Sequence, residues 1–108
     1  MAKRAQAAKQ TVGNAPARFA AGDRVRVLAM YPLGHVRTPW YIRGHEGVVE
    51  RLCGAYPNPE ELAYARSGQP GQPLYRVRFM QRKVWPDYAG NPTDTVDIEI
   101  YQHWLEPA

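Results

Sequence analysis

The feature that most constrains the fold of this chain is a set of four short segments in which apolar and charged residues alternate. They cover residues 23–28, 47–52, 74–79 and 96–100. Alternation with a period of two is typical of strands that are buried on one face. Glycines and prolines lie between the segments, where they favour turns. The pattern therefore predicts an all-β fold, a small partly open barrel with long loops.

The third and fourth segments carry complementary charges on the faces that point away from the core. These charges are Arg76 and Arg78 on one segment and Asp97 and Glu99 on the other. If the two strands pair, the opposite charges face one another across the ladder, which stabilises a sheet by roughly a few tenths of a kcal/mol per pair. We interpret these four residues as a solvated sheet face rather than as a binding patch.

One short helix is expected between the second and third strands. Asn58 is a good helix cap, Pro59 suits the first helical position, and a glutamate stands three residues after the cap. The helix should run to about Ala65, because the glycine- and proline-rich residues 67–73 end it. Residues 100–105 should then close the barrel as a turn of helix or as a last strand.

The distribution of charge argues against a nucleic-acid partner. The chain has 14 Lys+Arg and 10 Asp+Glu, but residues 1–18 hold four of the basic residues and no acid, which leaves 14 − 4 = 10 of each sign. A neutral body has no field that steers it to phosphate, so a nucleic-acid-binding barrel would depend on the basic segment alone. Because residues 1–18 are poor in large apolar side chains, we predict a flexible basic arm followed by a domain over residues 19–108.

The composition also indicates the cellular compartment and limits the chemistry that the cysteine content allows. No apolar run approaches the ~20 residues that span a bilayer, and residues 1–17 lack the apolar core of a signal peptide. We therefore expect a cytoplasmic protein with no membrane partner. Cys53 is the only cysteine, so it forms no internal disulfide and no cysteine cluster for a metal. We interpret it as a small buried apolar residue.

The segment from Gly34 to Gly47 combines two arginines, two aromatic residues and a proline between turn glycines. These residues predict a turn-rich loop rather than a helix. Arg37 and Arg43 should therefore project from a held loop, where a guanidinium is a fixed donor for an oxyanion or a carboxylate.

None of the usual catalytic constellations occurs in this sequence. It contains no nucleophile elbow and no phosphate-binding glycine loop, and the spacing of His35, His45 and His103 matches no zinc motif. We interpret Trp85 and Trp104 as core or interface anchors. On chemistry alone, the chain is a binding or accessory module.

Four pieces, taken in order, resemble the carboxy-terminal barrel of the nitrile hydratase beta subunit. They are Phe19 with residues 22–27, the Gly-His-x-Arg-x-Pro-x-Tyr-x-Arg-Gly loop of residues 34–44, residues 74–79, and Val84-Trp85 with the ending 101–106. The resemblance runs from Phe19 to the end of the chain and implies an SH3-like barrel. Thiocyanate hydrolase is similar to this family, with the beta subunit split between two chains, one of which is a short chain of this type.

The resemblance implies a subunit of a metalloenzyme that hydrates a nitrile to an amide. In such enzymes an alpha-type partner subunit holds cobalt(III) or iron(III) through a Cys-x-x-Cys-Ser-Cys segment with two oxidised cysteines, and this chain binds no metal. Arg37 corresponds by motif to an arginine that hydrogen-bonds the oxidised sulfurs, which makes it the candidate catalytic residue. Arg43 has either a direct role or a structural one, as a salt bridge that holds the loop. The expected contacts with the partner cysteines or the interface are His35, Arg43, Trp40, Tyr41 and Trp85.

Two departures from the family pattern open alternatives. Beta subunits begin with a helical domain that this sequence lacks, so a separate helical beta-type chain is expected as a second partner. The family usually has glycine after the tryptophan, whereas Pro86 follows Trp85 here, which looks closer to the short thiocyanate hydrolase chain. The alternatives are therefore a subunit that converts thiocyanate to carbonyl sulfide and ammonia, or a beta-like activator chaperone that assists metal loading.

Overall fold

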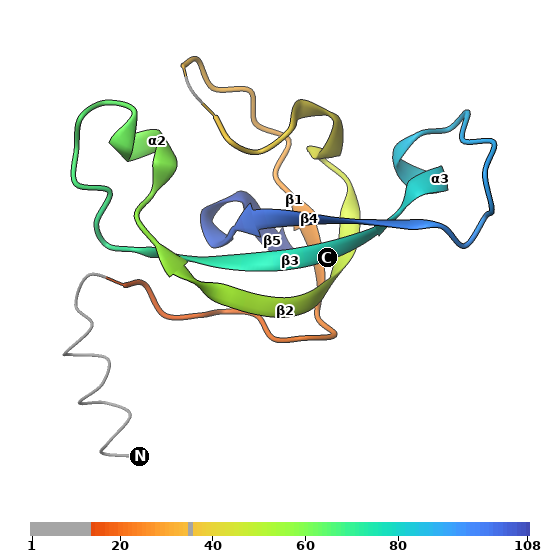
Figure 1. The fold of residues 1–108 in the computed structure, drawn as a ribbon, viewed down its shortest axis with the longest axis horizontal. Helices are drawn as coiled ribbons and strands as arrows, with labels where there is room; N and C mark the ends of the chain where they lie inside the picture. The colour runs from red at the N-terminus through yellow and green to blue at the C-terminus, as the bar shows by residue number, and fades with distance from the viewer. Residues whose placement is uncertain (1–13, 35) are drawn as a thin grey trace.

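The computed structural model describes residues 14–34 and 36–108, which form a single antiparallel sheet with short helical turns (Figure 1). The sheet has five strands in the order β4-β3-β2-β1-β5. The strands are β1 (Arg24–Val27), β2 (Glu46–Tyr56), β3 (Gln72–Met80), β4 (Thr95–Tyr101) and β5 (Leu105–Pro107). The four predicted strands are confirmed, and β2 and β3 extend beyond their predicted limits.

The sheet is curled so strongly that its two edge strands meet at one short connection. β4 and β5 are the outermost strands, yet only the 3-10 turn η2 (Gln102–Trp104) separates them along the chain. The amide of Leu28 donates to the carbonyl oxygen of Trp104 at 2.9 Å, which ties this turn to the end of β1. The predicted all-β, partly open barrel is therefore confirmed, and residues 100–105 supply both a helical turn and the start of a last strand.

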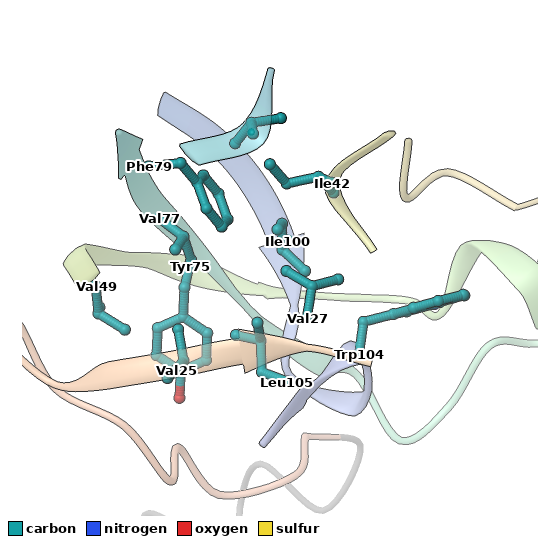
Figure 2. Packing of buried hydrophobic residues seen from close by; sticks show 11 residues of the cluster. Val25, Val27, Ile42, Val49, Tyr75, Val77, Phe79, Ile100, Trp104 and Leu105 are labelled. Carbon is teal, nitrogen blue, oxygen red and sulfur yellow. The ribbon is translucent and has the colours of Figure 1, made fainter. Parts of the chain in front are cut away.

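Apolar side chains from all five strands fill the interior of the barrel (Figure 2). Trp104 is 1% exposed, which confirms its interpretation as a core anchor. Burying a side chain of this kind stabilises a fold by roughly 3 kcal/mol. The core cluster consists of Val25, Val27, Ile42, Val49, Tyr75, Val77, Phe79, Val84, Ile100, Trp104 and Leu105.

Two irregularities in β2 bend the sheet. The register with β3 shifts between Val49 and Arg51 and again between Leu52 and Gly54, so Glu50 and Cys53 have no opposite residue. Extra residues of this kind bend a strand and increase its twist. These shifts were not predicted from the sequence, because a bulge leaves no mark in a short apolar pattern.

The predicted helix begins where the sequence placed it but ends at Leu62, before the expected end near Ala65. In α2 (Pro59–Leu62) the side chain of Asn58 accepts a hydrogen bond from the amide of Glu60 at 3.0 Å. Two further helical turns were not predicted, η1 (Trp40–Ile42) and α3 (Gln81–Val84). Neither begins with a side-chain cap, and each is held through one buried apolar residue that packs into the core.

Residues 14–18 lie against the barrel, although the composition suggested that the arm extends to residue 18. The amide of Ala15 donates to the carbonyl oxygen of Gly71 at 2.7 Å. The side chain of Gln102 accepts from the amide of Arg18 at 2.8 Å and donates to the carbonyl oxygen of Pro16 at 2.9 Å. Main-chain groups make these contacts, so the absence of apolar side chains did not reveal them. Residues 1–13 lie outside the described residues, and the arm stays a prediction for them.

Candidate functional site

Residues of β3, β4 and the loop before η1 line a shallow cleft of about 600 Å³. The sheet face that the sequence suggested was only solvated is therefore also one side of a concave site. Its charges are ion-paired, as expected. The lining residues are Arg37, Pro39, Arg76, Asp97, Ile98 and Glu99.

The guanidinium of Arg37 is anchored on β4 and remains accessible. Its Nη1 donates to the main-chain oxygen of Glu99 at 2.9 Å, and its Nη2 lies 3.7 Å from Oε1 of the same residue. The guanidinium carbon is 5.6 Å from the centre of the Tyr101 ring. Because 43% of the Arg37 side chain is exposed, its other N–H groups are available to an anion that enters the cleft.

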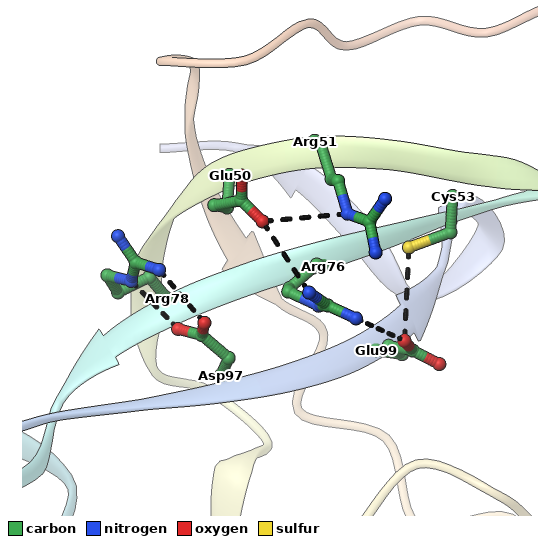
Figure 3. Close-up of polar contacts among 7 residues, drawn as sticks. All are labelled: Glu50, Arg51, Cys53, Arg76, Arg78, Asp97 and Glu99. Carbon is green, nitrogen blue, oxygen red and sulfur yellow. Dashed lines mark hydrogen bonds and ion pairs between the residues drawn. The ribbon is translucent and has the colours of Figure 1, made fainter.

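The carboxylate of Glu99 lies between two guanidiniums. Of its two carboxylate oxygens, Oε1 lies 3.7 Å from Nη2 of Arg37, and Oε2 accepts a hydrogen bond from Nη2 of Arg76 at 3.2 Å (Figure 3). This hydrogen bond raises the pKa of Arg76. The expectation that Arg76 and Arg78 face Asp97 and Glu99 is confirmed, and the register sets Arg76 opposite Glu99.

The irregular positions of β2 add two side chains to the same face, as Figure 3 shows. Oε1 of Glu50 lies 3.9 Å from Nη1 of Arg76 and 3.7 Å from Nε of Arg51. Sγ of Cys53 lies 4.0 Å from Oε2 of Glu99. Cys53 was expected to be fully buried, but it is half-buried, because the shift in register places its side chain on the charged face.

Arg43 holds the loop together. Its Nη1 donates to the carbonyl oxygen of Met30 at 3.0 Å and its Nη2 to that of Thr38 at 2.7 Å. The guanidinium carbon lies 4.9 Å from the centre of a ring of Trp104. These contacts agree with the structural alternative, but main-chain carbonyls take the place of the expected salt bridge. A contact between Arg43 and a partner stays a prediction.

Trp40, Tyr41 and Trp85 form a row of aromatic rings. The ring centres of Trp40 and Tyr41 are 6.2 Å apart, and those of Tyr41 and Trp85 are 5.5 Å apart. Trp40 is 73% exposed and Trp85 is 37% exposed, whereas Tyr41 packs against the core. Exposed aromatic rings are enriched at interfaces between proteins. The expected role of these three residues at an interface stays a prediction.

Neither of the two described histidines, His45 and His103, lines the cleft. His35 lies outside the described residues. The carbonyl oxygen of His45 accepts from the amide of Val27 at 2.9 Å, and Nε2 of His103 lies 2.7 Å from Oε1 of Glu60. In residues 14–34 and 36–108, no group of three or more His, Cys, Asp or Glu side chains is placed to hold a metal ion. Among the described residues, no helix is both long and apolar enough to cross a membrane.

The contacts that Glu99 and Tyr101 make with Arg37 were not predicted from the sequence. Glu99 is 62 residues away from Arg37 along the chain. The alternation of β4 did place Glu99 on the outward face, which was the one available signal. That signal does not indicate which loop will cover the face.

An open barrel with an accessible arginine in a cleft and an exposed row of aromatic rings defines an all-β module suited to contact with a partner. Comparison with known proteins then identifies the family. The family model described as "Nitrile hydratase beta subunit, C-terminal" matches residues 8–107. The chain belongs to this family, and the resemblance seen in the sequence is confirmed.

Relatives from two kinds of enzyme match the chain. Nitrile hydratase subunit beta of Pseudomonas putida is 36% identical over 90 residues, which are 83% of this chain and 41% of that protein. Thiocyanate hydrolase subunit alpha of Thiobacillus thioparus is 34% identical over 92 residues, which are 84% of this chain and 72% of that protein. A solved structure of recombinant apo-thiocyanate hydrolase from the same organism matches with a TM-score of 0.82 and 32% identity, and the match covers 89% of this chain and 80% of that chain. The chain spans about 40% of the length of the nitrile hydratase beta subunits from two Pseudomonas species that it matches.

Proposed function

We propose that this chain is the beta-type subunit of a nitrile hydratase family metalloenzyme that hydrates a nitrile to an amide. An alpha-type partner subunit carries the cobalt or iron ion, and a separate helical beta-type chain completes the assembly. The observation that carries the proposal is the position of Arg37 at a cleft, where 43% of its side chain is exposed. A relative named cobalt-containing nitrile hydratase subunit beta, from Pseudonocardia thermophila, is 34% identical over 91 residues and supports cobalt as the metal.

In this proposal Arg37 is the donor that this chain directs at its partner. A guanidinium stays charged at any working pH and donates two parallel hydrogen bonds to an oxyanion. The oxidised cysteines of the alpha-type subunit carry anionic oxygens that accept such bonds. The aromatic row of Trp40, Tyr41 and Trp85 supplies the surface on which the partner packs. In this proposal the metal belongs to the alpha-type subunit, and this chain contributes the donor groups of Arg37 and the packing surface.

A second candidate is a subunit of a thiocyanate hydrolase, which converts thiocyanate to carbonyl sulfide and ammonia. It is favoured by the match to the solved thiocyanate hydrolase, which covers 80% of that chain with a TM-score of 0.82. The substrate pocket involves the partner subunits, so the fold of this chain is compatible with both reactions. A cytoplasmic location stays a prediction for either.

Co-expression with an alpha-type chain that carries a Cys-x-x-Cys-Ser-Cys segment, and with a helical beta-type chain, tests the proposal. We expect a stable complex with stoichiometric metal that forms an amide from a nitrile. Release of carbonyl sulfide from thiocyanate, without amide formation, would support the second candidate. A chain that raises the metal content of the partner but is absent from the purified complex would overturn both in favour of the activator.

The role of Arg37 is tested in the active complex with Arg37→Lys, which keeps the charge and loses the planar two-pronged donor. We expect turnover to fall by about 100-fold, because a charged hydrogen bond in a dry site is worth roughly 3 kcal/mol. Arg82→Lys, at an exposed position of α3, is the matched control and should leave turnover unchanged. Near-normal turnover of Arg37→Lys in a fully metallated complex would show that the loop is only an interface element.

A further inference from the structure

We propose that Glu99 positions Arg37 for the anionic group that Arg37 binds, and that Arg76 fixes Glu99 in turn. The inference rests on the proposed role of Arg37. Glu99 and Arg76 are positioning residues, because they act through Arg37.

The first observation is that Glu99 offers a separate acceptor atom for each of its contacts. Its main-chain oxygen accepts from Nη1 of Arg37 at 2.9 Å, and its Oε1 lies 3.7 Å from Nη2 of Arg37. Its Oε2 accepts from Nη2 of Arg76 at 3.2 Å. The main-chain oxygen belongs to β4, and Glu99 pairs directly with Arg76 on β3. One end of the Arg37 guanidinium is therefore attached to the sheet, which is more rigid than the loop that carries Arg37.

The second observation concerns charge. Arg37 and Arg76 line the same cleft, so their guanidiniums repel one another unless an anion lies between them. The carboxylate of Glu99 directs one oxygen toward each of them. Within residues 14–34 and 36–108, no other carboxylate lies within ion-pair distance of Arg37. Asp97 also lines the cleft, but it is already engaged by Arg78 through two hydrogen bonds.

The third observation is that Tyr101 limits the positions open to the guanidinium. Its ring centre is 5.6 Å from the guanidinium carbon of Arg37, and Tyr101 is only 8% exposed. A buried ring cannot move aside easily. Together, the ring and the Glu99 oxygens restrain Arg37 while leaving some of its N–H groups for an incoming anion.

The chain offers a matched control for the loss of such a carboxylate. Glu46 also bridges two arginines, with Oε1 3.1 Å from Nη2 of Arg24 and Oε2 in contact with Arg26. The Glu46 side chain is 41% exposed and that of Glu99 is 37% exposed. Glu46 does not line the cleft with Arg37. Glu46→Gln therefore removes an equivalent ion pair without changing the surroundings of Arg37.

The kinetic experiment compares Glu99→Gln with Glu46→Gln in the co-purified, metallated complex. Glu99→Gln keeps the size of the side chain and the main-chain oxygen but removes the charge. We expect its kcat to fall roughly 10-fold with little change in KM, as is typical when a residue that orients a functional group is lost. Glu46→Gln should leave both parameters unchanged. On an Arg37→Lys background, Glu99→Gln should cause no further loss, because its effect passes through Arg37.

A second measurement does not depend on activity. In the isolated chain, NMR follows the rotation of the Arg37 guanidinium about its Nε–Cζ bond, with the signal assigned by its loss in Arg37→Lys. We expect rotation to be slow in the wild type, faster in Glu99→Gln and faster in Arg76→Gln, and unchanged in Glu46→Gln. Unchanged rotation in Glu99→Gln would overturn the proposal even where that variant fails to assemble with its partners.

The outcomes separate the failure of this inference from the failure of the proposed function. Normal turnover of Arg37→Lys would overturn the proposed role of Arg37 and the inference with it. A large loss in Arg37→Lys combined with normal kcat in Glu99→Gln would overturn the positioning role alone. An equal loss from Glu99→Gln in the wild-type and Arg37→Lys backgrounds would show that Glu99 acts independently of Arg37, which also overturns it.

Discussion

Arg78 and Asp97 form a two-point ion pair across the β3–β4 ladder. Nε of Arg78 donates to Oδ1 of Asp97 at 2.8 Å, and Nη2 donates to Oδ2 at 2.9 Å. These hydrogen bonds lower the pKa of Asp97 and raise that of Arg78. The Arg78 side chain is 49% exposed and the Asp97 side chain is 32% exposed, so water and salt screen the pair.

The first prediction is a pH dependence of the contribution that this pair makes to stability. We expect about 0.5 kcal/mol at neutral pH, the scale of a well-formed exposed ion pair. Because the pKa of Asp97 is lower in the folded chain than its ordinary value of 3.8, this contribution is complete above that pH and is lost as pH falls through the folded pKa. Urea unfolding should therefore show that Asp97→Asn is less stable than the wild type at pH 7, with a difference that shrinks below pH 3.8. A difference that stays constant with pH would contradict the assignment.

The second prediction concerns Arg43, which joins two parts of the loop through the carbonyl oxygens of Met30 and Thr38. Arg43→Met should lower the free energy of unfolding by about 2 kcal/mol, because both charged hydrogen bonds and the contact with Trp104 are lost. Arg82→Met, at an exposed site on α3, is the control and should change stability by less than about 0.5 kcal/mol. Equal stability of the two variants in chemical denaturation would show that Arg43 does not hold the loop.

The third prediction is that residues 14–18 contribute to thermal stability and that residues 1–13 do not. Deletion of residues 1–13 should leave the thermal midpoint unchanged, because that segment is poor in large apolar side chains. Deletion of residues 1–18 should lower the midpoint, because Gln102, which is 5% exposed, loses its partners at Pro16 and Arg18. Circular dichroism melting curves of the two truncated chains make the comparison. A large loss on deleting residues 1–13 would mean that this segment contributes contacts of its own.

The fourth prediction addresses the aromatic row and rests on the proposed function. Trp40 is 73% exposed, so Trp40→Ala should change the stability of the isolated chain by less than about 0.5 kcal/mol. In a complex, the same change should weaken binding to the partner by at least about 10-fold, because aromatic residues dominate interface energetics. Calorimetric titration measures the affinity, with Val48→Ala, an exposed position on β2, as the control. Unchanged affinity for Trp40→Ala would place the interface elsewhere.

Local pattern was sufficient to predict the strands and the start of the helix, and it singled out Arg37 as a candidate site residue. Alternating residues specify which side chains face the core, so the sequence placed two arginines and two acids on outward faces that would meet if β3 and β4 paired, as they do. The cap at Asn58 is equally local, because its hydrogen bond spans two residues. Arg37 was identified by its motif, and the structure places it at a cleft.

The surroundings of Arg37 and Arg43 depended on tertiary structure. Glu99 meets Arg37 only after the barrel brings together residues that are 62 positions apart. Both arginines bind main-chain carbonyl oxygens, and every residue carries such an oxygen, so no pattern of residue types marks the partner. The register shifts that bring Glu50 and Cys53 to the charged face likewise depend on the fit between two strands. Sequence alone thus determined where strands form and, except at irregular positions such as Cys53, which side chains face the core, because those properties follow local periodicity. Tertiary structure decided which exposed residues meet, because that requires the closure of long loops and the register of paired strands.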